Sequence, residues 1–257
     1  MTVSTGKQFE GKVALITGGG TGIGLATTQA FARERANVAL VGDEPEHVEA
    51  GVRLIEQEGA RALAIICDVS KPREVEAAVE RTVDEFGRLD FAFNNAGVEQ
   101  PVKPLDQISD DEFERLMEVD LRGVFLCMKH EVPAMLKNGG GVIVNTGSGA
   151  AIKGIAGQAG YCAAKFGVIG LTKAAALDYA AQNIRVNAVC PGYVDTPMMQ
   201  RFTGGTPEGW QKVLGNVPVG RPASPDEIAG TVLWLCSDAA AYVIGQALVV
   251  DGGQTVL

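Results

Sequence analysis

Short apolar runs alternate with helical stretches along almost the whole chain of 257 residues. Because several of the runs are nearly continuous in Val, Ile, Ala and Leu, they are typical of parallel strands covered on both faces. Alternating strands and helices predict a doubly wound α/β sheet, in which ligands bind at the carboxyl ends of the strands. The expected strands are Val13–Ile16, Val38–Val41, Ala62–Cys67, Leu89–Phe93, Val142–Asn145, Ile184–Val189 and Ala247–Val250. The expected helices lie near 22–35, 45–58, 72–86, 109–137, 158–181 and 225–237. Two of them open with the spacing of a capping box, at Ser109 with Glu112 and at Ser224 with Glu227.

A glycine-rich turn follows the first expected strand. It runs from Thr17 to Gly24 (TGGGTGIG) and leads directly into the first expected helix. Glycine lets the backbone approach a pyrophosphate closely, and the positive end of the helix dipole favours the negative charge there. A glycine-rich turn alone is a weak signal, but its position between a strand and a helix predicts a dinucleotide site.

A second motif places Tyr161 and Lys165 four residues apart in the run YCAAK, thirteen residues after Ser148. In a helix this spacing puts both side chains on one face, one turn apart. An ammonium group beside a phenol favours the phenolate, so the tyrosine can exchange a proton with a carbonyl or an alcohol oxygen. Taken alone, the pair favours two neighbouring side chains on a surface helix, because this spacing often occurs by chance.

Together these motifs resemble the short-chain dehydrogenase/reductase family. The resemblance rests on the glycine-rich turn, on Asn94–Gly97 (NNAG), Ser148 and the Tyr161–Lys165 motif, and on Asp68-Val69, Pro191-Gly192 with Thr196, and Asp251–Gly253. It covers essentially the whole chain in family order. It implies a Rossmann-type doubly wound parallel sheet with helices on both faces and a single domain spanning 1–257.

By this resemblance Tyr161 is the general acid/base, Lys165 lowers its pKa and holds the nicotinamide ribose, and Ser148 hydrogen-bonds the substrate oxygen. Tyr161 and Lys165 therefore also count as cofactor contacts. The remaining implied cofactor contacts are Gly18, Thr21, Gly22, Ile23 and Gly24 at the pyrophosphate, Asp68, Val69, Asn95, Ala96 and Gly97 at the adenosine side, and Pro191, Gly192, Val194 and Thr196 near the nicotinamide.

One position departs from the family pattern. The family usually carries an asparagine in the helix before the serine strand, where this chain has Asp120 in the run VDLRGVF. The usual asparagine supports a proton-relay water. We include Asp120 among the expected catalytic residues. The sequence does not give the direction in which a carboxylate at this position affects Tyr161.

The cofactor is predicted to be NAD in preference to NADP. The second expected strand ends at Val41, and Asp43 follows nineteen residues after Gly24. A carboxylate at this place accepts hydrogen bonds from the ribose hydroxyls and repels a 2′-phosphate. Asp43 also fits the alternative role of a solvated loop acid or a helix cap.

Residues 193–222 form the least regular stretch and, by the resemblance, cover the substrate. Their apolar side chains suit a cyclic or hydrophobic ketone or alcohol, although the same side chains could instead anchor the loop to the core. The expected substrate contacts are Ala150, Tyr193, Met198, Met199, Phe202 and Trp210.

Composition limits the other functional classes. A formal net charge of −9 argues against nucleic-acid binding. The two histidines belong to no ligand cluster, so no metal is expected, and a Ser-His-Asp hydrolase lacks both its motif and a histidine after Ser148. The five scattered cysteines and the lack of a signal peptide or membrane span predict a cytoplasmic protein with reduced thiols.

The sequence therefore predicts an enzyme that interconverts a secondary alcohol and a ketone. The alternatives are a non-catalytic NAD(H)-binding protein of the same fold and a sugar-nucleotide epimerase, for which the chain is too short. Residues 1–10 are expected to form a loosely ordered polar arm. A homotetramer is implied by the family's pairing through the helices at 109–137 and 158–181, the second with alanines at 163, 164, 174 and 175.

Overall fold

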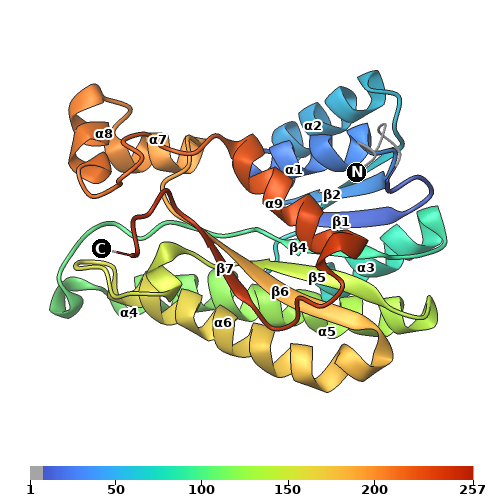
Figure 1. Cartoon of the computed structure of the whole chain (residues 1–257). Helices are drawn as coiled ribbons and strands as arrows, with labels where there is room; N and C mark the ends of the chain where they lie inside the picture. Colours follow the sequence, from blue (N-terminus) through green and yellow to red (C-terminus); the bar gives the residue numbers. More distant parts are fainter. Residues whose placement is uncertain (1–7, 257) are drawn as a thin grey trace.

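The protein is described by a computed structural model that covers residues 8–256. Its centre is one sheet of seven parallel strands in the order β3-β2-β1-β4-β5-β6-β7 (Figure 1). All seven expected strands are confirmed, with ends that differ by one or two residues. The strands are β1 (Val13–Thr17), β2 (Asn37–Gly42), β3 (Ala62–Ile66), β4 (Phe91–Asn94), β5 (Gly141–Thr146), β6 (Ile184–Pro191) and β7 (Ala247–Val250).

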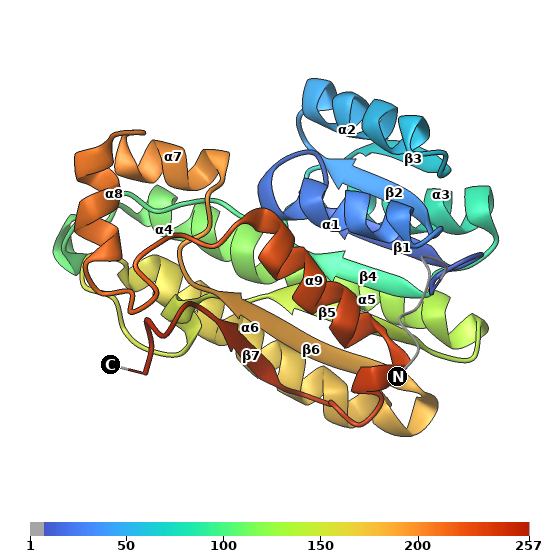
Figure 2. The same ribbon diagram turned by 45° about the horizontal axis from the view of Figure 1, so that its top comes forward.

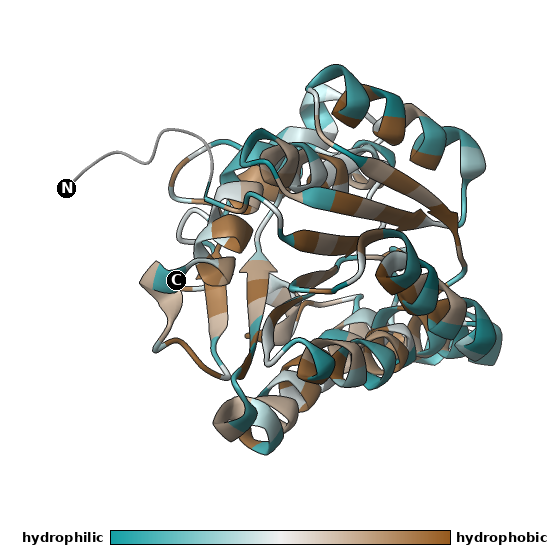
Figure 3. Cartoon of the chain, turned by 90° about the vertical axis from the view of Figure 1, so that its right-hand side faces the viewer, coloured by the Kyte–Doolittle hydropathy of each residue, from teal (hydrophilic) through white to brown (hydrophobic). Residues whose placement is uncertain are grey.

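Helices cover both faces of this sheet (Figures 1 and 2). Successive strand residues point to opposite faces, so Ala14 and Ile16 of β1 join one apolar cluster and Leu15 joins the other. The first cluster lies under α1 (Gly22–Arg33), α2 (Pro45–Gln57) and α9 (Pro225–Cys236), and the second under α3 (Pro72–Phe86), α5 (Gly123–Lys137) and α6 (Ala159–Tyr179). Figure 3 shows apolar strands between helices whose outer faces are hydrophilic, the pattern expected of a buried parallel sheet.

The expected helix at 109–137 is three segments in the structure. α4 (Asp110–Leu116) starts at a capping box formed by Ser109 and Glu112, as the sequence predicts. A π-helical segment, η2 (Met117–Arg122), then leads into α5. The backbone stays helical throughout, but the wider turn lies at Asp120, and π segments of this kind are frequent at functional sites.

The N-terminal arm is also more ordered than expected at its end. Phe9 is only 4% exposed, and its ring packs 5.3 Å from that of Phe31 and 4.9 Å from that of Phe91. Burial of an aromatic ring next to two others stabilises this segment. Residues 1–7 of the expected arm lie outside the described residues.

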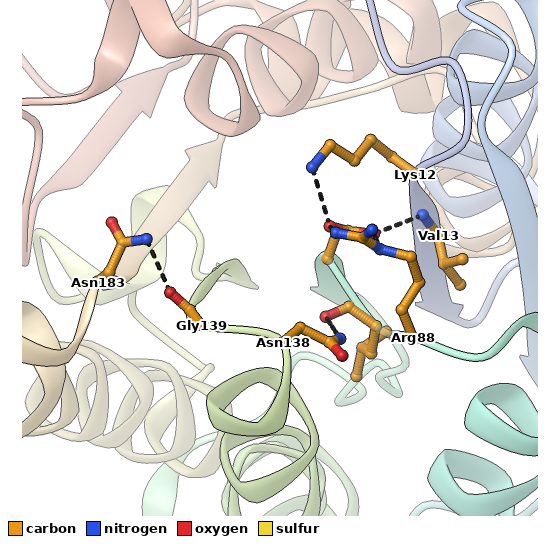
Figure 4. Close-up of polar contacts among 8 residues, drawn as sticks. Lys12, Val13, Arg88, Asn138, Gly139 and Asn183 are labelled. Carbon is orange, nitrogen blue, oxygen red and sulfur yellow. Dashed lines mark hydrogen bonds and ion pairs between the residues drawn. The ribbon is translucent and has the colours of Figure 1, made fainter.

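Polar contacts tie the loops together at the amino ends of the strands (Figure 4). The Asp90 carboxylate accepts hydrogen bonds from the Val13 N–H at 3.0 Å and from Arg88 Nε at 2.7 Å, and Lys12 Nζ lies 3.2 Å away. These contacts join the starts of β1 and β4. They leave the carboxyl ends of the same strands, where the chain order reverses, free to form the site.

Candidate active site

A cavity of about 810 Å³ lies at the carboxyl ends of the strands. Its wall includes residues that follow β1 to β6, together with part of the segment between β6 and α9. Nearly every residue that the sequence selects lies on this wall. The exceptions are Gly24 and Trp210. The expected residues on the wall are Gly18, Thr21, Gly22, Ile23, Asp43, Asp68, Val69, Asn95, Ala96, Gly97, Asp120, Ser148, Ala150, Tyr161, Lys165, Pro191, Gly192, Tyr193, Val194, Thr196, Met198, Met199 and Phe202.

The glycine-rich turn has the backbone geometry of an anion cradle. Gly18 and Gly22 have φ angles of +62° and +51°, which other residues rarely adopt. Gly24 packs so closely on this turn that a Cβ there would lie 1.9 Å from the carbonyl oxygen of Gly18, which explains why it is inside the turn and not on the wall. Thr21 precedes α1 without a side-chain capping bond. The first N–H groups of α1 are therefore available to a pyrophosphate.

The loops after β1 and β4 are held together beside this turn. Thr17 Oγ1 accepts hydrogen bonds from the N–H groups of Asn95 at 2.9 Å and Ala96 at 3.1 Å. Asn95 Nδ2 donates to the Thr17 carbonyl oxygen at 3.2 Å. These hydrogen bonds join the two loops into one wall, where an adenosine could lie. Together with the first N–H groups of α1, which can bind phosphate, this wall fits a dinucleotide.

Tyr161, Lys165 and Ser148 all lie on the wall of this cavity. Tyr161 and Lys165 share one face of α6, and Lys165 Nζ lies 5.5 Å from the centre of the Tyr161 ring. Lys165 is 3% exposed and donates a hydrogen bond to the Thr146 carbonyl oxygen at 3.2 Å. Ser148 lies close enough to Tyr161 to act to lower the pKa of its phenol, and the Ser148 Oγ accepts a hydrogen bond from the Ala150 N–H at 3.1 Å. The three side chains can therefore act on one substrate atom.

Asp120 belongs to the same group. It is fully buried, and its Oδ2 lies 3.2 Å from Lys165 Nζ. Its Oδ1 accepts a hydrogen bond from the Val98 N–H at 2.7 Å. The structure thus brings the unusual carboxylate into direct contact with the lysine.

The net shift in the pKa of Tyr161 is opposite to the one expected from the sequence. Lys165 does act to lower the pKa of Tyr161, as does the hydrogen bond with Ser148. Burial has the largest effect and raises that pKa, and the Asp120 charge raises it further. The net result in the protein without cofactor is a raised pKa for Tyr161, not a lowered one.

Comparison with known proteins shows the family to which the chain belongs. Residues 18–255 match the family model described as Enoyl-(Acyl carrier protein) reductase. The chain belongs to the short-chain dehydrogenase/reductase family. Its fold and the order of its motifs are those that the sequence resemblance predicts.

Relatives in this family share the chain almost end to end. A 2,5-dichloro-2,5-cyclohexadiene-1,4-diol dehydrogenase of Sphingobium indicum is 41% identical over 97% of this chain and 99% of its own. A cyclohexanol dehydrogenase of an Acinetobacter species is 42% identical over 96% of each chain. The crystal structure of levodione reductase superposes with a TM-score of 0.94 at 38% identity, covering 96% of this chain and 99% of the other. The 3-ketoacyl-(acyl-carrier-protein) reductase of Brucella melitensis, solved with NADH, gives 0.90 at 35% identity, with 96% and 99% covered.

Sequence reasoning missed the residue that supports Tyr161 in this short-chain dehydrogenase/reductase. Gln100, 2% exposed, accepts a hydrogen bond from the Tyr161 N–H at 2.9 Å through its side-chain oxygen and donates to the Gly157 carbonyl oxygen at 3.1 Å. Gln158, which precedes α6, makes no side-chain capping bond. Gln100 therefore caps α6 from a distant loop, and no local motif could have indicated it.

The segment over the cavity is more helical than expected. Residues 193–222 contain α7 (Pro197–Thr203), which Thr196 caps by accepting the Met199 N–H at 3.3 Å, and α8 (Pro207–Leu214). Figures 1 and 2 show both helices at the carboxyl end of the sheet. Met198, Met199 and Phe202 lie on the cavity wall. Trp210 does not, and Lys212 and Val213 of the same helix line it instead.

Proposed function

We propose that this oxidoreductase interconverts a secondary alcohol and a ketone on a cyclic, uncharged substrate, with NAD(H) as its preferred cofactor. Family membership makes the protein an oxidoreductase that acts on CH–OH groups and uses a nicotinamide dinucleotide. The observation that carries the proposal is that Ser148, Tyr161 and Lys165 line the same cavity as the glycine-rich turn.

The proposed roles of the residues follow from this geometry. The nicotinamide supplies or accepts the hydride when the cofactor is bound. Tyr161 donates its phenolic proton to the carbonyl oxygen in reduction, or takes the hydroxyl proton in oxidation. Ser148 holds the same oxygen through its hydroxyl group. Lys165 places a positive charge beside the phenol and offers N–H donors to the ribose.

The preference for NAD rests on Asp43. It follows β2 directly, is exposed and lies on the cavity wall. Glu44 lines the wall next to it. Two carboxylates at this place would repel a 2′-phosphate, and Asp43 can accept hydrogen bonds from the ribose hydroxyls.

The substrate class rests on the wall above the catalytic residues. Met198, Met199, Phe202 and Val213 present apolar side chains there. Arg201, also on this wall, is paired with Glu99. Three of the relatives named above, the dichlorocyclohexadienediol dehydrogenase, the cyclohexanol dehydrogenase and levodione reductase, act on ring alcohols or ketones, which supports a cyclic substrate for this chain as well.

A non-catalytic NAD(H)-binding role explains less of the site. It would require the dinucleotide cradle but not a serine, tyrosine and lysine arranged around one substrate position.

Location in the cytoplasm stays a prediction, supported by the five free cysteines. Among the described residues, no helix has the length and apolarity needed to cross a bilayer.

We also propose that the protein is a homotetramer. The outer side of α5 and α6 exposes Phe125 and Phe166, at 47% and 48%. Ala163 and Ala174 of α6 are exposed too, whereas Ala164 is buried and Ala175 packs on the core. Exposed aromatic rings beside small residues suit a close helix pair between subunits.

A substrate screen tests the function. NADH and NADPH oxidation would be followed with cyclohexanone, a cyclohexanedione, an acyclic ketone of equal carbon number and a ketone bearing a phosphate. We expect turnover of the cyclic ketones with NADH. Turnover of the phosphorylated ketone alone, or of none of the ketones, would contradict the proposal.

A further inference from the structure

We propose that Asp120 is a positioning residue that holds the Lys165 ammonium group and, by offsetting its charge, moves proton exchange at Tyr161 to higher pH than an asparagine would. The inference rests on the proposed function, because it concerns the same proton transfer. It goes further in assigning a role to the one side chain in which this site departs from the family pattern.

The first support is the geometry of Asp120. Its two oxygens are used differently: Oδ1 accepts the Val98 N–H at 2.7 Å, and Oδ2 lies 3.2 Å from Lys165 Nζ. The side chain is fully buried and packs closely on Gly97, where an added Cβ would lie 3.2 Å from Oδ2. The carboxylate is therefore fixed against the ammonium group.

The second support is the set of charges around Tyr161. Lys165 of α6 faces it as a cation, and Asp120 of η2 faces it as an anion. Cys162 is the titratable neighbour on its own helix, and Ser148 contributes a neutral hydroxyl group. Cys190 of β6 faces Lys165, and Glu99 faces Asp120. Within residues 8–256, Lys165 is the only group that favours the phenolate by its charge, and Asp120 is the anion in direct contact with Lys165.

This arrangement has a defined consequence for the proton. In alcohol oxidation the Tyr161 phenolate must take the hydroxyl proton, while the hydride leaves the carbon for the cofactor. A carboxylate next to the lysine opposes formation of that phenolate, because it adds a like charge and offsets the positive charge of Lys165. An asparagine amide has no net charge and lacks this effect. The pH at which the rate of oxidation reaches half of its maximum should therefore be higher in the wild-type enzyme than in the Asp120→Asn variant.

The test compares Asp120→Asn with wild type in the full-length enzyme. The first readout is kcat/KM for oxidation of cyclohexanol with NAD as a function of pH. The second is the ultraviolet absorbance of phenolate in the protein without cofactor, with Tyr161→Phe subtracted to isolate Tyr161. We expect both midpoints to move down by about one pH unit, at the low end of the effect of a nearby charge.

Two controls separate this role from a structural one. Glu114→Gln removes the same charge from an exposed position on α4 and should leave both midpoints in place. Asp120→Ser gives a second uncharged variant if Asp120→Asn does not fold, and it should move the midpoints in the same direction.

Three outcomes are distinguishable. A lower kcat with unchanged midpoints, or midpoints that move up, would overturn the inference while leaving the proposed function intact. Absence of oxidation by the wild-type enzyme would count against the proposed function, and the phenolate titration would still decide the role of Asp120.

Discussion

Arg201 and Glu99 join the cover of the cavity to the loop after β4. Arg201 Nε lies 2.7 Å from Glu99 Oε1, and Nη2 lies 3.0 Å from Oε2, although 102 residues separate the two in sequence. Arg201 is in α7, and Glu99 follows Val98, whose N–H binds Asp120. The hydrogen bonds from Arg201 hold the pKa of Glu99 below its usual range. A two-contact ion pair therefore fixes α7 next to the catalytic group.

Arg201→Ala should weaken substrate binding. The pair is partly exposed, so its contribution is about 0.2–1 kcal/mol, which corresponds to a KM increased by a factor of about 1.4 to 5, with a smaller change in kcat. Steady-state kinetics with a cyclic ketone measures this. Arg221→Ala breaks an equivalent pair with Glu227, at 2.8 Å for both contacts, and should leave KM unchanged. Equal effects of both variants would show that α7 is not held by Arg201.

Glu131→Gln should change how stability depends on pH. Glu131 of α5 is fully buried and its Oε2 accepts a hydrogen bond from Asn94 Nδ2 at 3.0 Å. Burial raises its pKa from 4.5 to about 8. The folded state therefore retains a proton that the unfolded state releases, and the stability gained this way is lost as pH rises from 4.5 toward about 8.

Urea unfolding at several pH values measures this effect. Relative to wild type, the variant should gain up to about 1.4 kcal/mol of unfolding free energy per pH unit within that window, because glutamine cannot ionise. A difference between the two proteins that stays constant with pH would contradict the account of Glu131.

Asp43→Arg should shift cofactor use toward NADPH. The change removes a carboxylate from the cavity wall and places a cation where a 2′-phosphate would lie, so we expect the NADH-to-NADPH ratio of kcat/KM to fall at least about tenfold. Glu46→Arg makes the same change of charge on α2 at a residue outside the wall and should leave the ratio near its wild-type value. Equal or better use of NADPH by the wild-type enzyme would refute the assignment of Asp43.

Phe166→Glu should dissociate the predicted tetramer. A charge on the exposed face of α6 would be costly to bury against another subunit. Light scattering at micromolar concentration should then show a smaller species than wild type. Leu54→Glu, the same kind of change at an exposed apolar residue of α2, tests whether any added negative charge has this effect. If the wild-type protein has the mass of a single chain, the tetramer is wrong.

Local patterns predicted the strands, most helices and the motif residues on the cavity wall. Apolar runs mark buried strands, and the capping boxes at Ser109 and Ser224 were readable because their contacts lie three residues apart. The glycine-rich turn could also be located from the sequence, because its glycines are close together in the chain and are required by the turn that they form.

The parts that sequence did not predict depend on contacts between distant segments. Gln100 caps α6 from 61 residues away, and Glu99 meets Arg201 across 102 residues. The helices α7 and α8 were missed because prolines and glycines at their ends suggested an irregular loop. The raised pKa of Tyr161 depends on burial and on Asp120, which no spacing rule contains.

The most direct test of the active site is the comparison of Tyr161→Phe with wild type in NADH oxidation with a cyclic ketone, with cofactor Kd measured in parallel. Phenylalanine keeps the ring but removes the proton donor, so kcat should fall at least about 100-fold while Kd for NADH stays within about twofold of wild type. If the variant retains a tenth or more of the wild-type kcat, Tyr161 is not the acid/base of this enzyme.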